Sequence, residues 1–511
     1  MSRLVLFLGM TGYAALLCVG GVLEALGVPE GILVRLVAIA AFAGISVAAW
    51  AAATMRDRIY IGGGRDISAF GSGAWLATEA VGIAVLLAVA LPIAGSGTSV
   101  VLLLLAALAG LLIAGAAFAP AIHADEAPTV PDFLARRFGS LVVRLFTMFL
   151  AAAICCLLLI LLLQAIAAGL AMLLGIDQQP ALMLIAVLLA LTCLPGGMKA
   201  ATNTRSLYLI LLTISCIAPV AWTLISPEAM LLSAASPSIS LAAPHSFSLD
   251  AGAALCLAVA ISALPSLLAG PMAMRRGPDF RVNVWGVAIG LLLLALVPIL
   301  AHMLQTGPDV YLGGFPKPFA QSLGFEDLPR VLLVLAAMGT LMAALSVASS
   351  LLLTVANTLG HDLFYRALHP AAPPSSRLAV SRLLPLVVLA LASWASTQTF
   401  DALAIVSWTL VFAAAGLFPA LVLGIWWKSV TAIGTIAGMA AGVGLPAIFI
   451  LGVRYGVDLS PGTGDEWTRW WGTSDLSAAL AGIPAAFAVS AAASLLPPML
   501  RRNPSEATAR S

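Results

Sequence analysis

The chain is poor in charged residues, which make up 9% of its 511 residues, whereas hydrophobic residues make up 62%. Soluble domains hold about 25% charged residues. No soluble core could cover this much apolar surface, so the composition predicts an all-α polytopic membrane protein. The net charge is only +2, and no basic domain or basic-aromatic platform is present. A nucleic-acid partner is therefore not expected.

Cysteine is scarce, and its spacing indicates no chemistry. The six cysteines, all in or beside apolar stretches, are Cys18, Cys155, Cys156, Cys193, Cys216 and Cys256. They match neither a zinc site nor a disulfide framework, so free buried thiols are expected. The chain also lacks a Walker motif, a nucleophile elbow and a metal-ligand pair. These absences argue against an ATP-driven pump and against an enzyme.

Long apolar runs are abundant instead. A membrane-spanning helix needs about 20 predominantly apolar residues. On that rule we predict about fourteen transmembrane helices, over 4–27, 32–54, 69–94, 98–121, 141–174, 180–195, 206–225, 251–273, 283–304, 329–358, 377–397, 401–425, 430–453 and 476–498.

Lys and Arg gather in alternate connections between these spans, as the positive-inside rule predicts for cytoplasmic loops. That set contains Arg56, Arg58, Arg65, Arg136, Arg137, Arg144, Lys199, Arg205, Arg275, Arg276, Arg281, Arg366, Arg377, Arg382, Lys428, Arg501 and Arg502. The other connections hold few, among them Lys317, Arg454 and Arg469. The alternation predicts both termini in the cytoplasm. We expect a multi-pass protein of the bacterial inner membrane.

One acidic residue, Glu79, lies inside a predicted span. Counted from the cytoplasmic edge near Ser68, it lies roughly 16 Å deep, close to the middle of the membrane. A carboxylate facing lipid there costs about 2.5–3.5 kcal/mol. Glu79 should therefore face a cation or a polar cavity, or carry a proton and bond to a neighbouring helix.

A second polar feature follows one side of the span 329–358. Ser346, Ser350, Thr354 and Asn357 recur at helical spacing in an otherwise apolar helix. Small residues also let helices pack closely, so packing alone is an alternative explanation. Ser346 can reach the depth of Glu79. We therefore predict that Glu79 and the face of Ser346 and Ser350 form two walls of one central site.

Several short stretches carry a family signature. They are TVPDFLARRFG at Thr129–Gly139, GGMKAA at Gly196–Ala201, the small residues before His361-Asp362-Leu363, the Gln164-Ala165…Gly169 helix, and Phe418-Pro419 with Trp426-Trp427-Lys428. In this order and spacing the chain resembles the sodium:solute symporter family, especially its acetate and small-monocarboxylate permease branch.

The resemblance implies a LeuT-like fold with two inverted five-helix repeats, here 69–225 and 251–425. The transport core would then be residues 69–425, flanked by peripheral helices in 1–68 and 426–511. In that fold a Na⁺ ion lies between core helices one and eight, held by carbonyls of an unwound first helix and by hydroxyls of the eighth. Matched residue by residue, Ala343 (by its carbonyl) and Ser346 fall on the eighth-helix positions.

The chain departs from the family pattern at this place. Val347 stands where a hydroxyl residue is frequent, and the Ser-Ala-Ala-Ser segment after the acid is replaced by Ala80–Ala84. Oxygen ligands are lost, whereas a longer acid is kept at Glu79. Both Na⁺ and H⁺ therefore stay open as coupling ion.

The sixth core helix contains Leu264-Pro265-Ser266. Pro265 is expected to break this helix, although an ordinary kink is the alternative. A broken helix presents N–H groups and a positive dipole end, which suit a carboxylate. No Arg or Lys is expected at mid-depth to bind an anion.

Four further residues are candidates for lining the substrate site, although a bond to a neighbouring helix is the alternative for Gln164 and packing is favoured for the other three. They are Trp75, Thr78, Gln164 and Trp408.

The sequence-based hypothesis is a secondary active symporter that imports a small organic solute, a monocarboxylate such as acetate, with Na⁺ or H⁺. The alternative is a degenerate transporter-like protein that acts as a solute sensor or as an assembly partner. A small membrane partner protein or an oligomer is compatible with either, and the sequence defines neither.

Overall fold

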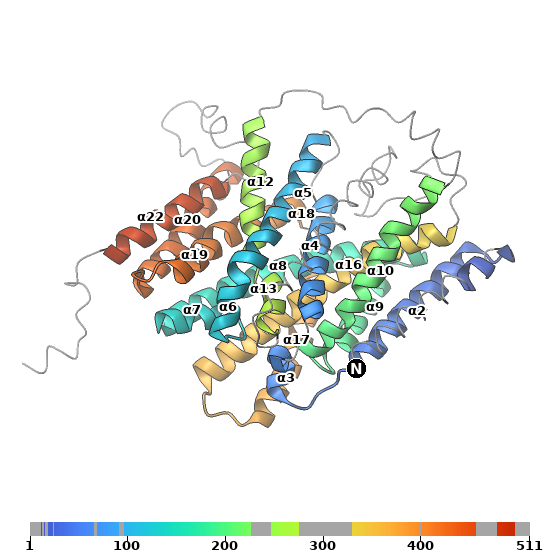
Figure 1. Cartoon of the computed structure of the whole chain (residues 1–511), viewed down its shortest axis with the longest axis horizontal. Helices are drawn as coiled ribbons and strands as arrows, with labels where there is room; N and C mark the ends of the chain where they lie inside the picture. The colour runs from blue at the N-terminus through green and yellow to red at the C-terminus, as the bar shows by residue number, and fades with distance from the viewer. Residues whose placement is uncertain are drawn as a thin grey trace, which may run out of the picture.

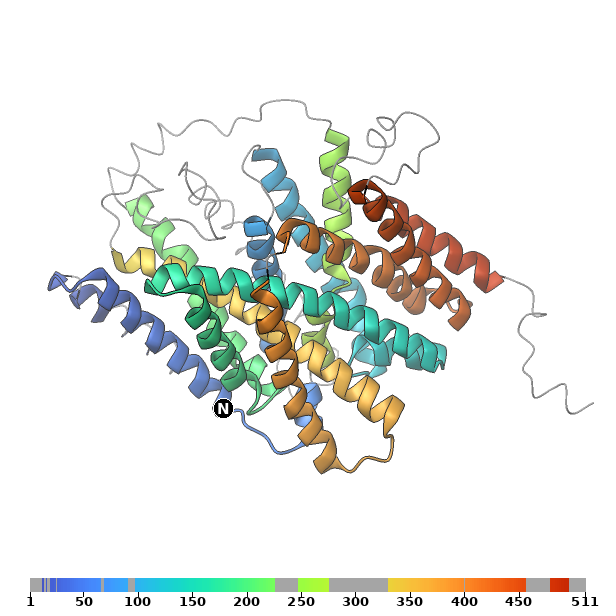
Figure 2. The same ribbon diagram turned by 180° about the vertical axis from the view of Figure 1, so that it is seen from behind.

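The computed structural model describes residues 25–65, 69–90, 97–225, 247–274, 330–398, 400–455 and 478–495, together with residues 12, 15 and 19–23. Within these ranges the chain is helical and forms one bundle (Figures 1 and 2). The predicted span 283–304 lies outside the described residues, as do most of 4–27, the tail from Arg501 and the segment with Trp467, Trp470 and Trp471.

The helices of the first half are α2 (Glu30–Trp50), α3 (Asp57–Gly62), α4 (Ala69–Ala90), α5 (Gly97–Leu112), α6 (Ala119–Asp125), α7 (Val130–Phe138), α8 (Leu141–Leu174), α9 (Gln178–Cys193) and α10 (Met198–Ile225). Those of the second half are α12 (Phe247–Ser262), α13 (Pro265–Met272), α16 (Arg330–Asn357), α17 (Pro374–Ser396), α18 (Ala402–Phe412), α19 (Phe418–Trp426), α20 (Ala432–Tyr455) and α22 (Ala479–Leu495). Short 3-10 or π-helical segments join some of them, namely η1 (Gly63–Arg65), η2 (Ile113–Phe118), η3 (Thr358–Leu368) and η4 (Ala413–Leu417).

Eight helices in the described part of the chain are long and apolar enough to cross a membrane, or nine if the bent pair α9 and α10 forms one span. The protein is therefore a multi-pass membrane protein. The helix α8 coincides with the predicted span 141–174. The total of fourteen spans and the division into core and peripheral helices stay predictions.

Local signals set the ends of the connecting helix α7 and of the long helix α8. Thr129 Oγ1 caps α7 by accepting a hydrogen bond from the backbone N–H of Asp132. Gly139 ends that helix at φ +60°, a left-handed conformation that glycine adopts without steric cost. Ser140 then caps α8, and Gly175 at φ +64° ends it.

The helix α16 forms the centre of the bundle and packs against α4, α8, α10 and α13 (Figures 1 and 2). In the most apolar 18-residue stretch of its span, Leu341–Leu368, every residue is buried, against 28% for the span of α17. The polar stripe on α16 therefore faces protein rather than lipid, as expected for polar side chains in a membrane-spanning helix. Large apolar side chains of α17 such as Leu391 and Trp394 are exposed, which suits a lipid-facing helix.

The helices α4 and α16 approach closely at Gly82. A Cβ atom at Gly82 would lie 2.8 Å from the carbonyl oxygen of Ala343 and would also overlap Val347 Cγ2. Small residues permit such close approach between membrane helices. Gly82 and Val347 thus fill the space where the resemblance places sodium ligands.

The predicted break at Pro265 is confirmed. The helix α12 ends at Ser262, Leu264 is extended at ψ 123°, and Pro265 is the first residue of α13. Pro is favoured at this position because its missing N–H would have no helical acceptor there. The implied unwinding of the first core helix is wrong, since α4 continues from Ala69 to Ala90.

The helices α20 and α22 form a pair at the edge of the bundle opposite α2 (Figure 1). Cβ atoms at Gly434 and Gly438 would lie 2.7 Å from the carbonyl oxygens of Ser490 and Ala486 respectively. This pair therefore packs through small residues rather than through large apolar side chains.

Candidate functional site

Glu79 on α4 faces Arg205 on α10, and both side chains have no exposed surface. Arg205 Nη1 lies 2.9 Å from Glu79 Oε2. A buried charge requires a partner of opposite sign, because desolvation costs several kcal/mol for each ion. The expectation that Glu79 faces a cation is thus met by a side chain of the same chain.

The guanidinium of Arg205 also binds backbone and hydroxyl oxygens from two other helices. Nη1 donates to the carbonyl oxygen of Trp75 at 3.2 Å and to Thr78 Oγ1 at 3.0 Å. Nη2 donates to the carbonyl oxygen of Ser346 at 2.9 Å. Arg205 Cζ lies 3.8 Å from the centroid of the Trp75 ring, which adds a cation–π interaction.

Ser350 connects α16 to the same carboxylate. Its hydroxyl lies 2.6 Å and 2.8 Å from the two oxygens of Glu79 and 2.8 Å from Val347 O, so its single proton is shared among these acceptors. The hydroxyl of Ser346 is buried and has no hydrogen-bond partner among the described residues. We call the group Trp75, Thr78, Glu79, Arg205, Ser346 and Ser350 the Arg205 cluster.

The structure therefore brings together the two walls predicted from the sequence, with Ala343 packed beside them against Gly82. The ion-binding role of Glu79, Ala343, Ser346 and Ser350 stays a prediction. Thr78 and Trp75 belong to this cluster, and their predicted contact with substrate also stays a prediction.

The assignment of Arg205 to a cytoplasmic connection is wrong, and so is the expectation that mid-depth holds no Arg. The helix α10 begins at Met198 rather than near 206, so Arg205 lies two turns inside it. The predicted span began after Arg205 because a hydropathy rule excludes a charged residue whose neutralising partner is unknown. The signal that could have identified Arg205 was Glu79, which needed a cation.

A small enclosed void lies beside the cluster, where α4, α8, α13, α16 and α18 meet. It has a volume of about 10 Å³ and is lined by Ile83, Leu158, Ser266, Val347, Leu351, Val406 and Leu410. This space holds at most about one water molecule.

Ser266 is the polar residue among those that line this void. Its hydroxyl is fully buried without a hydrogen-bond partner among the described residues. Its carbonyl oxygen accepts a 2.9 Å hydrogen bond from the indole N–H of Trp75, so the break before α13 is tied to the Arg205 cluster. Pro265 itself lines a second void of about 10 Å³, next to Thr129 and Thr354.

Two predicted substrate residues lie away from the void. Trp408 is partly buried and packs against the apolar core, whereas its neighbours Val406 and Leu410 line the void. Residues two positions apart on a helix point to different sides, which explains the difference. Gln164 is partly exposed and is not among the lining residues.

A second polar cluster connects α7 and α8 to η3. Arg144 Nη1 binds Asp132 Oδ1 at 2.7 Å and Asp362 Oδ1 at 2.8 Å, and Thr129 Oγ1 donates to Asp362 Oδ2 at 2.7 Å. Arg136 binds the other oxygen of Asp132 at 2.6 Å. We call these five residues the α7–η3 cluster. The segments α7, α8 and η3 thus meet at the end of the bundle that the basic residues predict to be cytoplasmic.

Asp132 is held ionised in this cluster. Burial alone would raise its pKa, but the His361 imidazole, 3.7 Å away, and the guanidinium groups of Arg144 and Arg136 outweigh burial and leave the pKa well below its usual range. His361 Nε2 and the carboxylates of Asp132 and Asp362 lie within 4.8 Å of one another. Because Arg144 already binds both carboxylates, these donors do not fit a metal ion.

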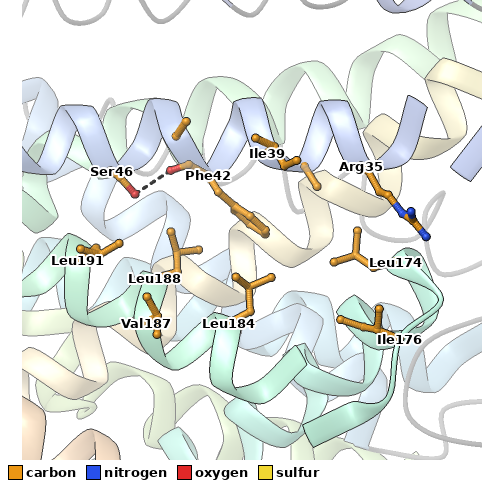
Figure 3. A pocket seen from close by; sticks show the side chains of 12 residues that line it. Arg35, Ile39, Phe42, Ser46, Leu174, Ile176, Leu184, Val187, Leu188 and Leu191 are labelled. Atoms are coloured by element: carbon orange, nitrogen blue, oxygen red, sulfur yellow. Dashed lines mark hydrogen bonds between the residues drawn. The ribbon is translucent and has the colours of Figure 1, made fainter. Parts of the chain in front are cut away.

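A larger groove lies on the periphery of the bundle, between α2, α8 and α9 (Figure 3). It has a volume of about 480 Å³ and apolar walls, with Phe42, Leu184 and Leu188 near its middle and Arg35 at one end. No residue of the Arg205 cluster lines it. Its place and lining suit lipid chains.

Solved structures of similar shape define the fold. A Na⁺-coupled sialic acid symporter in a substrate-bound outward-open state has a TM-score of 0.71 at 15% identity, covering 92% of this chain and 98% of that one. Mhp1, a nucleobase-cation-symport-1 family transporter, has a TM-score of 0.52 at 15% identity, covering 86% and 95%. These likenesses show that the fold is LeuT-like, as the resemblance implied.

The chain belongs to the sodium:solute symporter family, whose model matches residues 60–442. An uncharacterized symporter of Cupriavidus necator is 41% identical over 172 residues, which is 34% of this chain and 25% of that protein. The match thus spans about a quarter of the curated relative. The family and these structural neighbours are transporters rather than enzymes.

Proposed function

We propose that the protein is a secondary active symporter. It imports a small organic solute, a monocarboxylate such as acetate, by alternating access, with Na⁺ or H⁺ as the coupling ion. Membership of the sodium:solute symporter family and the LeuT-like fold support transport. In such folds the solute lies near the midplane, beside a discontinuous helix.

The observation that carries the proposal is the unpaired hydroxyl of Ser266 at the start of α13. A buried polar group without a partner is costly and calls for an explanation. Here Ser266 lines an enclosed void at a helix N-terminus, where the helix dipole favours a negative charge. A carboxylate placed there would accept a hydrogen bond from Ser266 and interact with the positive end of α13.

The remaining lining of the void favours a small solute with an apolar tail. Ile83, Leu158 and Leu351 surround Ser266 with hydrocarbon. A void of about 10 Å³ is too small even for acetate, so the helices around it must separate before solute binds. Such separation belongs to alternating access.

The test is uptake of labelled acetate by purified protein in proteoliposomes, under an imposed Na⁺ gradient, an imposed pH gradient or neither. Uptake that requires one of the gradients is the expected result. Uptake that ignores both gradients would exclude symport, and binding without uptake would favour the sensor or assembly alternative.

Ser266→Ala provides the specific variant. A hydrogen bond to a charged group contributes about 1.5–3 kcal/mol, so we expect the half-saturating acetate concentration to rise roughly tenfold or more. The matched control is Ser262→Ala, because Ser262 is equally buried but its hydroxyl already donates to Val259 O at 2.7 Å. Equal effects of both substitutions would contradict a solute contact at Ser266.

A further inference from the structure

The oxygen atoms around Arg205 form a set that suits a hard monovalent cation. They are the carbonyl oxygens of Trp75 and Ser346, the hydroxyl of Thr78 and the carboxylate of Glu79, all 2.9–3.2 Å from the guanidinium nitrogens. Hard cations take oxygen ligands of these kinds, from backbone carbonyls, hydroxyls and carboxylates. In this protein the positive charge among them is the guanidinium.

We propose that Arg205 is a built-in cation that takes the place of an exchangeable Na⁺ between α4 and α16, so that Na⁺ neither stabilises this site nor drives transport through it. The statement about what drives transport rests on the proposed function. The statement that this site does not bind Na⁺ holds whatever the substrate is.

The position of Arg205 and the chemistry of the guanidinium group support the replacement. Arg205 has no exposed surface and reaches both α4 and α16 from α10, so it holds together the helix pair that an ion would bridge. The guanidinium is permanently charged and has five N–H donors but no acceptor, so it satisfies oxygens only. An additional cation beside it would meet a like charge in a buried, weakly screened environment.

The packing next to the cluster points the same way. Gly82 approaches Ala343 and Val347 so closely that a Cβ atom would not fit. Val347 supplies a methyl group, not an oxygen, toward α4 at that level. Direct packing at Gly82 on one side and Arg205 on the other therefore leave no space for an ion where α4 and α16 cross.

The consequence concerns the coupling ion. A tethered charge cannot leave with the solute, so it transfers no energy from a Na⁺ gradient. Coupling at this site would then require H⁺, or the solute's own gradient would drive its movement. Lithium, potassium and choline would be equivalent to Na⁺ for the stability of the wild-type protein.

The experiment compares Na⁺ with choline in two measurements, thermal unfolding of the purified full chain and acetate uptake by proteoliposomes. For the wild-type protein, and for Arg205→Lys, which keeps a positive charge, we expect no difference between the two cations. For Arg205→Ala, which leaves the oxygens without their cation, we expect Na⁺ to raise the unfolding temperature and to increase uptake by about tenfold, a typical size for ligand coupling. Arg205→Gln, which fills more of the space, tests the same response.

The matched control is Arg137→Ala. Arg137 also donates to backbone carbonyls, those of Gly424, Trp427 and Lys428, but it lies in α7 away from the Arg205 cluster. We expect no Na⁺ response in this variant. A response equal to that of Arg205→Ala would overturn the proposal, because it would reflect general stabilisation by salt.

Two other results would overturn the proposal. One is a wild-type protein that Na⁺ stabilises more than choline does. The other is that Na⁺ and choline give the same unfolding temperature and the same uptake for both Arg205→Ala and Arg205→Gln, and this holds even if one of the variants fails to fold. Failure of acetate uptake under every gradient would contradict the proposed function instead, since the unfolding measurement needs no substrate.

Discussion

The buried pair Glu79–Arg205 allows a quantitative test of what holds the centre of the bundle together. Both side chains are fully buried and their charged atoms lie 2.9 Å apart. Removing one partner of such a pair leaves an uncompensated buried charge, which costs about 3–5 kcal/mol. We therefore expect Glu79→Gln to lower the free energy of unfolding by about 3 kcal/mol. The lower end of the range applies because Arg205 keeps Trp75 O and Ser346 O as acceptors.

The double substitution Glu79→Gln with Arg205→Met removes both charges. Replacing a whole buried ion pair by neutral groups of similar size is frequently close to neutral. The double variant should therefore be more stable than either single variant, with a coupling energy of about 3 kcal/mol between the two sites.

The assay is denaturant or thermal unfolding of the four proteins in detergent. Losses of stability that simply add, to within about 0.5 kcal/mol, would refute the argument, because additivity is expected of independent sites.

Three further predictions concern packing, capping and pH. Gly82→Ala should destabilise the protein by about 1–3 kcal/mol, because its Cβ would lie 2.8 Å from the backbone of α16. Gly44→Ala, at a site with no atom within 4 Å, should be neutral or slightly stabilising. Thr129→Ala should cost about 1–2 kcal/mol, because the side chain both caps α7 and donates to Asp362. The lowered pKa of Asp132 means that its stabilisation is complete at neutral pH and is lost only in strong acid, as pH falls through the native-state pKa. The cost of Asp132→Asn should therefore be larger at about pH 5 than at about pH 3, because the unfolded-state carboxyl takes up its proton in that interval and the native one does not.

Each of these has an outcome that would contradict it. If Gly82→Ala and Gly44→Ala change the unfolding temperature equally, the close approach of α4 and α16 does not restrict the size of the side chain at position 82. For Thr129, the control is Ser140→Ala, a cap of α8 with a single 3.4 Å hydrogen bond, and an equal loss there would remove the role given to Asp362. A cost of Asp132→Asn that is the same at about pH 5 and about pH 3 would show that the native-state pKa of this carboxyl is not lowered.

The sequence predicted much of the fold because lipid imposes simple rules. The span 141–174 coincides with α8, and the break at Pro265 lies where the missing N–H predicts it. Counting residues at a fixed rise placed Glu79 and the face of Ser346 and Ser350 at the same level, which predicted the observed contact between Glu79 and Ser350. The depth of Glu79 in the membrane stays a prediction.

The candidate site was only partly predictable. Gln164 and Trp408 were plausible by residue type, but the void is lined by their neighbours, since the rotation of a helix about its axis depends on packing. The unwinding expected in α4 is absent, and Gly82 packs directly against α16.

The sequence by itself determined that the chain crosses the membrane repeatedly, that one carboxylate lies inside an apolar helix, and that one core helix is broken at a proline. Only the tertiary structure showed which charge neutralises that carboxylate, because Arg205 follows Glu79 by more than a hundred residues and looked like a loop residue. Helical periodicity reports the neighbours of a residue on its own helix. The contact between α4, α10 and α16 depends on how three separate helices pack, which no local pattern encodes.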